Sequence, residues 1–327
     1  MGNIWCVGQR YDALITNAAV TTSDDGIIWN DILHINPPFL SRDEPTSIIF
    51  NNNSLVVGST IGNISITTNF LTWTEGSMGA DNGIIITGMT ASSSFFTCGQ
   101  RTYLTSDDIF TEGSEVAQIF RSNTGYPGTF NLVFTEGDFP TIFYNIKYFP
   151  SADIGNSILQ EVVVAVGNHT GSPYAVYSTD NGTMWSRLDI PNEITGSFFD
   201  IEYDSSNAYW YIGGSGKIVI ASNLINPVWT ESTTFGDTLS EVYRLHMNPQ
   251  GQIVAATPGA LWFSSNLENW NSFSVPGYFW KSITWYNNQW IAGAQSIMTQ
   301  YTFWVSSDAV TWIPHNNHVQ PVSFTIS

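Results

Sequence analysis

The sequence predicts an all-β protein: a single β-propeller domain of seven four-stranded antiparallel blades that spans residues 1–327. Two observations support this fold class. A short turn motif that ends in an aromatic residue occurs seven times, with the aromatic residues at positions 29, 73, 110, 185, 229, 270 and 312. In addition, apolar residues nowhere follow the 3.6-residue period of a helix. Short strands in units of about 40 to 45 residues are typical of propeller blades.

The turn motif begins with Ser or Thr, has Asp or Asn two residues later, and ends in Trp or Phe. Its fullest copy runs from Ser178 to Trp185. An Asp or Asn side chain accepts hydrogen bonds from backbone N–H groups within a turn, and Gly adopts a positive φ. Seven copies predict a structural role. The residues with this predicted role are Ser23, Asp25, Trp29, Asn69, Trp73, Asp107, Ser178, Asp180, Gly182, Trp185, Asn223, Trp229, Asn266, Trp270, Asp308 and Trp312.

Besides the strand that leads into the turn, three more strands can be recognised around each turn motif. A β-rich run, usually ending in Gly, precedes the aromatic residue by about 15 to 20 residues, and another strand begins at the aromatic residue itself. Ahead of the Gly-ending run lies a strand of alternating pattern, which we expect to be the innermost of its blade. These expected innermost strands cover residues 47–50, 86–90, 144–148, 199–203, 243–247 and 281–285.

The two ends of the chain complement each other. The first copy begins with its Gly-ending strand and lacks an innermost strand, whereas the last copy is followed by a β-like tail. We therefore expect the first blade to comprise residues 3–36 plus 319–327, so that the C-terminal strand closes the ring. Closure of this kind removes open strand edges.

One interval between aromatic positions, from 110 to 185, is longer than the others. We interpret residues 111–142 as an insertion. An eighth blade is the alternative, because Phe134-Thr135-Glu136-Gly137 is similar to Trp73-Thr74-Glu75-Gly76. Against an eighth blade, no Gly-ending strand and no Ser-x-Asp turn occur in this interval.

Charge and composition exclude several classes of function. Nine basic and 27 acidic residues give a formal net charge of −18. Such a chain repels nucleic-acid phosphates and anionic membranes. No apolar run approaches the roughly 20 residues of a membrane helix, and no secretory signal is recognisable at the N-terminus. We expect no nucleic-acid partner and no membrane insertion, while a virion or extracellular surface and the cytoplasm both stay open as locations.

The segment from Ser178 to Trp185 resembles the Asp-box, also called the bacterial neuraminidase repeat. This resemblance implies a sialidase-like or photosystem II assembly factor-like propeller. It also implies that the motif lies between the third and fourth strands, on the face opposite the usual ligand site. Propellers with this box include glycosidases, lectins, assembly factors and viral attachment proteins. The resemblance therefore predicts architecture rather than function.

Catalytic residues are not apparent. A sialidase-like site needs three converging Arg side chains and a Tyr/Glu nucleophile pair. In this chain the family's Arg-Ile-Pro-type segment is absent, and of the six Arg residues only Arg244 falls in an expected innermost strand. No phosphate-binding loop, zinc motif, Gly-x-Ser-x-Gly elbow or EF-hand occurs. We expect no catalytic residue, no metal and no cofactor, and we expect that the chain is not a sialidase.

Ligands of propellers usually bind at the face opposite the turn motif. We expect this face to carry Arg10, Tyr11, Arg101, Tyr174 and Tyr301, together with Arg121 and Tyr126 of the 111–142 segment. The expected innermost strands bring further polar residues to the channel mouth, namely Lys147, Asp200, Glu202, Arg244, His246 and Lys281. These charges either hold a polar ligand or neutralise one another around a water-filled channel.

The favoured hypothesis is a non-enzymatic, lectin-like recognition or attachment module that binds a glycan or a protein receptor. Scarce Lys and a surface rich in Asn, Ser and Thr resemble viral, phage or exported surface proteins, so assembly with other virion proteins fits as well. A glycoside hydrolase or lyase with carboxylates at the channel mouth is one alternative, because 27 acidic residues offer many pairs. An intracellular assembly scaffold is the other.

Overall fold

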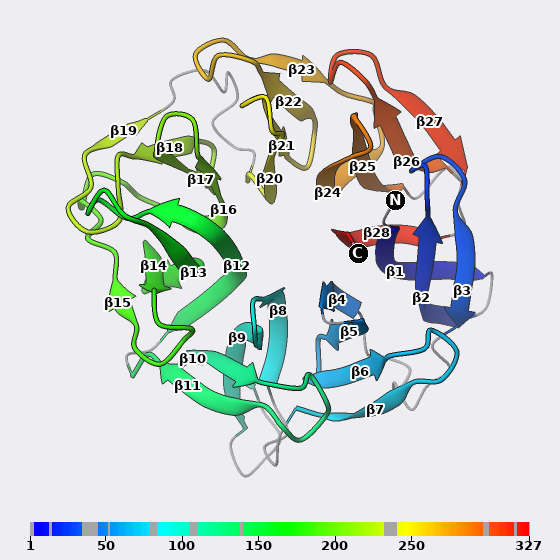
Figure 1. The fold of residues 1–327 in the computed structure, drawn as a ribbon, viewed down its shortest axis with the longest axis horizontal. Helices are drawn as coiled ribbons and strands as arrows, with labels where there is room; N and C mark the ends of the chain where they lie inside the picture. The colour runs from blue at the N-terminus through cyan, green and yellow to red at the C-terminus, as the bar shows by residue number, and fades with distance from the viewer. Residues whose placement is uncertain are drawn as a thin grey trace.

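The computed structural model describes residues 3–12, 15–34, 45–51, 53–78, 84–104, 110–137, 140–231, 241–296, 301–316 and 319–326. In these residues the secondary structure is all β, without helices, and forms seven four-stranded sheets. The sheets are arranged as blades around a central axis (Figure 1). The predicted seven-bladed propeller is therefore confirmed.

Each blade has four strands, which follow one another from the axis to the rim. In this order, blade 1 comprises β28 (Val319–Ile326), β1 (Ile4–Asp12), β2 (Ile15–Ser23) and β3 (Asn30–His34). Blade 2 comprises β4 (Pro45–Asn51), β5 (Ser54–Ser59), β6 (Asn63–Thr67) and β7 (Thr74–Ser77). Blade 3 comprises β8 (Ile84–Ala91), β9 (Phe95–Leu104), β10 (Phe110–Ser122) and β11 (Asn131–Thr135). Blade 4 comprises β12 (Thr141–Asp153), β13 (Leu159–His169), β14 (Ser172–Ser178) and β15 (Ser186–Arg187).

The remaining blades have the same order of strands. Blade 5 comprises β16 (Phe198–Asp204), β17 (Tyr209–Gly214), β18 (Ile218–Ala221) and β19 (Trp229–Glu231). Blade 6 comprises β20 (Arg244–Met247), β21 (Ile253–Ala256), β22 (Leu261–Ser264) and β23 (Asn271–Phe273). Blade 7 comprises β24 (Tyr278–Tyr286), β25 (Gln289–Ser296), β26 (Tyr301–Ser306) and β27 (Ile313–Asn316). Connections between blades and loops from second to third strands share one face, which we call the loop face. The opposite face, with the turns from third to fourth strands, is the turn face.

The C-terminal strand closes the ring, as predicted. Strand β28 pairs antiparallel with β1 from Ile4↔Ile326 to Arg10↔Val319 and becomes the innermost strand of blade 1. It also contacts blade 2, because the Ser323 and Thr325 hydroxyls accept hydrogen bonds from the backbone N–H groups of Ile48 (3.4 Å) and Phe50 (3.1 Å). The last strand of the chain is thus bonded to two blades.

The interpretation of residues 111–142 as an insertion is wrong. Most of this segment forms β10 and β11, the third and fourth strands of blade 3. The aromatic residue at 110 therefore begins the third strand rather than the fourth, and Asp107 lies outside the described residues. Strands β9 and β10, with 10 and 13 residues, exceed those of most other blades, so the turn comes later in the sequence.

The turn between the third and fourth strands of blade 3 lies between Ser122 and Asn131. The Ser122 hydroxyl accepts a hydrogen bond from Gly125 N–H at 2.9 Å, and Gly125 has a φ of 76°. Thr124 stands where other copies have Asp or Asn, and Phe130 supplies the buried aromatic side chain. These replacements explain why the motif of blade 3 was not recognisable in the sequence.

Other turns on the turn face share one hydrogen-bond pattern. In blade 4 the Asp180 carboxylate accepts the Ser178 hydroxyl at 2.8 Å and the backbone N–H groups of Thr183 and Met184 at 3.0 and 2.9 Å. Burial alone raises the pKa of Asp180, but these donors more than offset it, and the pKa is lowered. The corresponding acceptors in four other blades are Asp25, Asn69, Asn266 and Asp308. The Ser or Thr hydroxyl that begins the turn accepts a further backbone N–H, as Ser178 does from Gly182 at 2.9 Å, so two side chains close the turn.

We expect Asp180→Ala to lower the free energy of unfolding by about 1 to 2 kcal/mol, because two backbone donors and one hydroxyl lose their acceptor. Asp180→Asn is the matched control. Asn69 and Asn266 already accept the same bonds in their own turns, so this change is expected to cost under about 0.5 kcal/mol. Urea denaturation measures both values. Equal losses in the two variants contradict a role for the acceptor oxygen.

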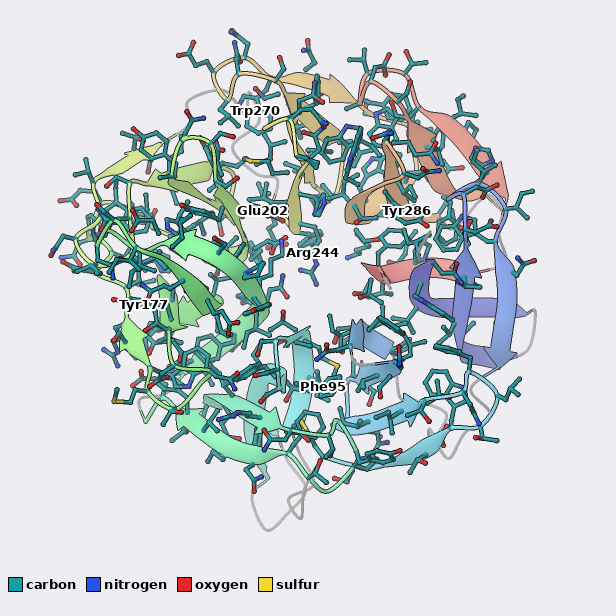
Figure 2. The ribbon with its side chains drawn as sticks, viewed as in Figure 1. Phe95, Tyr177, Glu202, Arg244, Trp270 and Tyr286 are labelled. Carbon is teal, nitrogen blue, oxygen red and sulfur yellow. The ribbon has the colours of Figure 1, made fainter. Side chains whose placement is uncertain are left out.

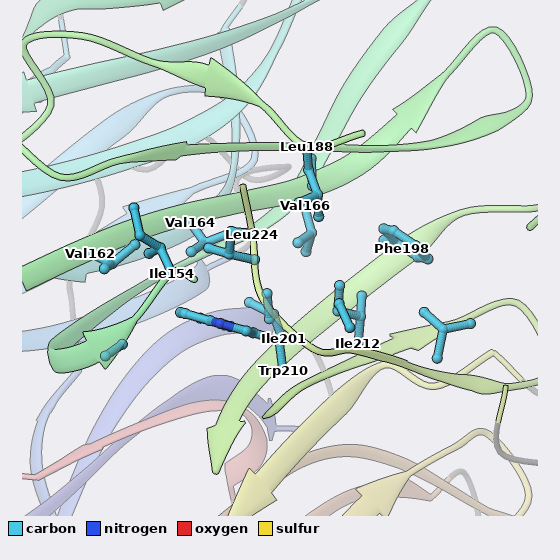
Figure 3. Packing of buried hydrophobic residues seen from close by; sticks show 14 of the residues in the cluster. Ile154, Val162, Val164, Val166, Leu188, Phe198, Ile201, Trp210, Ile212 and Leu224 are labelled. Carbon is cyan, nitrogen blue, oxygen red and sulfur yellow. The ribbon is translucent and has the colours of Figure 1, made fainter. Parts of the chain in front are cut away.

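The hydrophobic core lies between blades. Between blades 4 and 5, Val164 and Val166 pack in one cluster with Ile201, Trp210 and Ile212 (Figure 3). Comparable clusters of buried apolar residues occur between other neighbouring blades. Close packing on both faces holds the innermost strands at fixed positions, so residues at the axis can act together.

Candidate functional site

The innermost strands of six blades carry a β-bulge near their loop-face ends. The paired register shifts around one extra residue, which leaves the ladder. The extra residues are Thr46, Thr87, Tyr144, Phe199, Lys281 and Val322. In blade 6, Tyr243 directly precedes β20, and its N–H donates to the Ala256 carbonyl at 2.9 Å. Bulges redirect side chains and frequently adjoin functional sites.

Four consecutive blades place large side chains at this height. The ring centroids of Tyr144 and Phe199 are 4.8 Å apart, and those of Phe199 and Tyr243 are 5.9 Å apart. The Lys281 ammonium lies 4.4 Å from the centroid of the Tyr243 ring, a cation–π distance. We call Tyr144, Phe199, Tyr243 and Lys281 the mouth row. They form a partly apolar arc that ends in a cation.

Deeper along the axis lies an ion cluster built on Lys147. Its ammonium donates to Asp200 Oδ2 (3.0 Å), to Glu202 Oε1 (2.8 Å) and to the Leu245 carbonyl (3.0 Å). Asp200 is fully buried and also accepts from Asn145 Nδ2 and Leu245 N–H, both at 2.7 Å. This cluster connects the innermost strands of blades 4, 5 and 6.

Titration of the ion cluster reflects mutual neutralisation. Burial alone lowers the pKa of Lys147, but the charges of Asp200 and Glu202 outweigh it and the pKa is raised. Burial alone raises the pKa of Glu202, but the Lys147 ammonium and His246, whose Nδ1 lies 3.5 Å from Glu202 Oε1, outweigh it and the pKa is lowered. Among the described residues Lys147 therefore pairs with Asp200 and Glu202, and His246 lies beside Glu202.

Arg244 and Lys281 differ from this cluster. Among the described residues neither forms an ion pair. One guanidinium nitrogen of Arg244 donates to the Tyr243 carbonyl at 2.8 Å. Burial lowers the pKa of Lys281. The Glu241 carboxylate opposes this effect more strongly than the Arg244 guanidinium adds to it, but burial outweighs the carboxylate and the pKa stays lowered. Both side chains are half-buried, so the channel mouth holds two cations without carboxylate partners within 4 Å in the described part of the chain.

A cavity of about 250 Å³ opens beside these groups. Side chains of the innermost strands line the cavity, among them Lys147, Asp200, Arg244 and His246. Figure 2 shows Arg244 near the centre of the ring and Glu202 at its inner edge, whereas Tyr177 and Trp270 lie toward the rim. The described residues contain no group of three or more His, Cys, Asp or Glu side chains suited to a metal ion. Nor does any helix within them have the length and apolarity to span a membrane.

The structure corrects the placement of three predicted surface residues. Tyr174 is only 6% exposed, its ring stacks on Phe143 at 5.7 Å, and its hydroxyl bonds Glu136 and Arg187. Burial and the Glu136 carboxylate raise the pKa of Tyr174, so this Tyr/Glu pair lacks an activated nucleophile. The end of β10 and the turn that follows it carry Arg121 and Tyr126, which are therefore on the turn face.

For the other residues predicted on the loop face, the structure describes only the backbone. Arg10 and Tyr11 lie near the end of β1, Arg101 lies near the end of β9, and Tyr301 begins β26. Their side chains lie outside the described residues. The mouth row was missed as a unit, although its signal was present: four expected innermost strands begin at Tyr144, Phe199, Tyr243 and Lys281. The bulges at Tyr144, Phe199 and Lys281, together with the ring contacts of Tyr243, show that these four positions share one height.

Comparison with known proteins supports the fold. No protein-family profile and no curated protein matches the sequence. A protein from Lactobacillus plantarum superposes with a TM-score of 0.65 at 9% identity over all of both chains. YCF48 bound to D1 peptide gives 0.57 at 12% identity, over 83% of this chain and 80% of that one. A GH74 xyloglucanase from Xanthomonas campestris gives 0.58 at 13% identity, over 83% of this chain and 45% of the enzyme. At such identities the similarity concerns the fold alone.

Proposed function

We propose that this propeller is a non-enzymatic recognition module that binds a segment of a partner protein at the loop face, over the mouth of the channel. The observation that carries this proposal is the pair Arg244 and Lys281, which lies beside the aromatic rings of the mouth row without carboxylate partners within 4 Å among the described residues. Aromatic and Arg side chains are enriched where proteins bind proteins. A similar propeller, YCF48, is known bound to D1 peptide.

The turns support a further part of the proposal, that the chain is an Asp-box propeller. Hydrogen bonds from the turn backbone to Asp180, Asp25 and Asp308 are those the motif predicts. They lie on the turn face, away from the mouth row. A structural role for the motif leaves the loop face free for recognition.

Hydrolysis of glycosides is disfavoured by the state of the channel carboxylates. A general acid needs a raised pKa, whereas the pKa of Glu202 is lowered. Asp200 is fully buried and bonded to Lys147 and to backbone. The aromatic rings of the mouth row are tilted or edge-to-face rather than aligned as one flat platform, so stacking of a pyranose is also disfavoured.

A random peptide library displayed on phage tests the proposal. We expect peptides to be enriched on the immobilised protein and to bind at least tenfold more weakly to Tyr243→Ser, which removes the centre of the mouth row. The matched control is Leu71→Ser on the turn face, where Leu71 is 78% exposed. Its affinity should be unchanged. The proposal is overturned if binding is lost in the Leu71 variant alone. It is also overturned if the protein binds on a glycan array without peptide enrichment, or if it turns over fluorogenic glycosides.

A further inference from the structure

We infer that the channel mouth binds a single carboxylate of the ligand between Arg244 and Lys281. This inference rests on the proposed function and specifies its ligand chemistry. Arg244 is one of the residues that line the cavity, and Lys281 directly precedes Ser282, another of them. Neither cation has a carboxylate within 4 Å among the described residues. The charge of Arg244 also acts on Lys281, so the two cations lie near each other at the mouth.

Partly burying a cation without a counter-ion is unfavourable. Burial lowers the pKa of Lys281 and outweighs the opposing charge of Glu241, while the like charge of Arg244 adds to the lowering. The Tyr243 hydroxyl is bonded to Glu241, and burial together with this carboxylate raises the pKa of Tyr243 to about 12. Glu241 is therefore already engaged. An incoming carboxylate supplies the missing negative charge.

The local charge favours a monoanion. Arg244, Lys281 and Glu241 sum to one positive charge at the mouth, whereas deeper in the channel Lys147 faces Asp200 and Glu202, with His246 beside them. A carboxylate with one charge balances the mouth, whereas a dianionic phosphate exceeds it. A guanidinium also matches the two oxygens of a carboxylate.

The net charge of the protein restricts the ligand further. With −18 on the whole chain, a polyanion is repelled wherever it extends beyond the mouth. A single acidic group entering the channel is attracted by nearby cations, while distant charges are screened beyond about 8 Å at physiological salt. The structure thus favours one acidic side chain or one chain terminus of the partner protein over an acidic polysaccharide.

Calorimetry with sodium acetate and with sodium phosphate, each at constant ionic strength, tests the site directly. We expect millimolar acetate binding that weakens at least tenfold in Arg244→Gln and in Lys281→Gln. The matched control is Lys217→Gln, since Lys217 is a loop-face cation already paired with Glu231. It should bind acetate as the wild type does. Equal acetate affinity in all four proteins, or tighter binding of phosphate than of acetate, overturns the inference.

Thermal denaturation separates a ligand site from a structural role. Because the pKa of Lys281 is lowered on folding, its ammonium form opposes folding, and Lys281→Gln is expected to raise the melting temperature by about 1 °C without ligand. Lower melting temperatures with unchanged acetate affinity in both Gln variants contradict the inference.

Peptides selected by phage display identify the source of the carboxylate. We compare peptides with an amidated C-terminus and peptides in which each Asp or Glu is replaced by its amide. One of these changes should reduce the affinity of the peptide for the protein at least tenfold. If all of them bind equally well and still require Tyr243, the recognition function stands and the carboxylate site is rejected. If no peptide binds but acetate does, the recognition function fails and the anion site stands.

Discussion

Removal of residues 319–327 is expected to abolish cooperative folding of the propeller at 37 °C. Strand β28 is the innermost strand of blade 1, and its loss exposes the β1 ladder together with the buried residues Ile4, Trp5 and Cys6. It also removes the hydrogen bonds that join Ser323 and Thr325 to blade 2. The expected loss of about 5 kcal/mol or more is comparable with the whole stability of a typical domain. Circular dichroism with urea denaturation measures it.

Complementation provides the control for this truncation. A synthetic peptide of residues 317–327 should restore cooperative unfolding to the truncated protein, and a scrambled peptide of the same composition should not. Thr325→Val, which removes the acceptor of the Phe50 N–H, should cost about 1 kcal/mol. Unchanged melting of the truncated chain would show that the ring does not depend on its C-terminal strand.

The blade count and the ring closure were predictable because each depends on local sequence. The turn motif repeats where a backbone turn needs an acceptor, as at Asp180 and Asp308, and the tail has the alternation of a strand. The turn of blade 3 was not recognised in the sequence because it has Thr124 at the acceptor position and follows unusually long strands. A motif placed by spacing alone fails where strand length varies.

The sequence predicted which residues lie at the channel, but not which of their charges form ion pairs. Innermost strands identified Lys147, Asp200 and Glu202 as neighbours of the axis. Which charge meets which depends on the height of each residue, and the bulges set that height by adding one residue per strand. The alternation pattern contains no signal for a bulge. Hence Lys147 and Lys281, both expected at the axis, turned out to be paired and unpaired respectively.

Lys147→Met is expected to lower the free energy of unfolding by about 2 to 4 kcal/mol. The change leaves Asp200, which is fully buried, and Glu202 without their cation, and it removes a donor to the Leu245 carbonyl. Breaking a buried ion pair from one side costs about 3 to 5 kcal/mol, and the lower range for this pair reflects the 24% exposure of Lys147. The triple variant Lys147→Met, Asp200→Asn, Glu202→Gln should recover at least half of the loss.

The pH dependence distinguishes charge from packing in this cluster. In the wild type the lowered pKa of Glu202 contributes stability above its ordinary pKa of 4.5, and this contribution is lost as the pH falls through the lower folded-state value. The raised pKa of Lys147 contributes below 10.5 and is lost as the pH rises through its higher folded-state value.

In Lys147→Met the buried Glu202 carboxylate loses its cation, so its pKa should rise above that of the unfolded chain. The folded variant then binds more protons than the unfolded one near pH 5, and its stability must increase as the pH falls from 7 to 5. Urea denaturation from pH 7 to pH 3 should show that the variant gains stability between pH 7 and pH 5, whereas the wild type loses stability below pH 4.5. Parallel pH profiles would mean that Lys147 contributes by packing, and that Asp200 and Glu202 are held by their other hydrogen bonds.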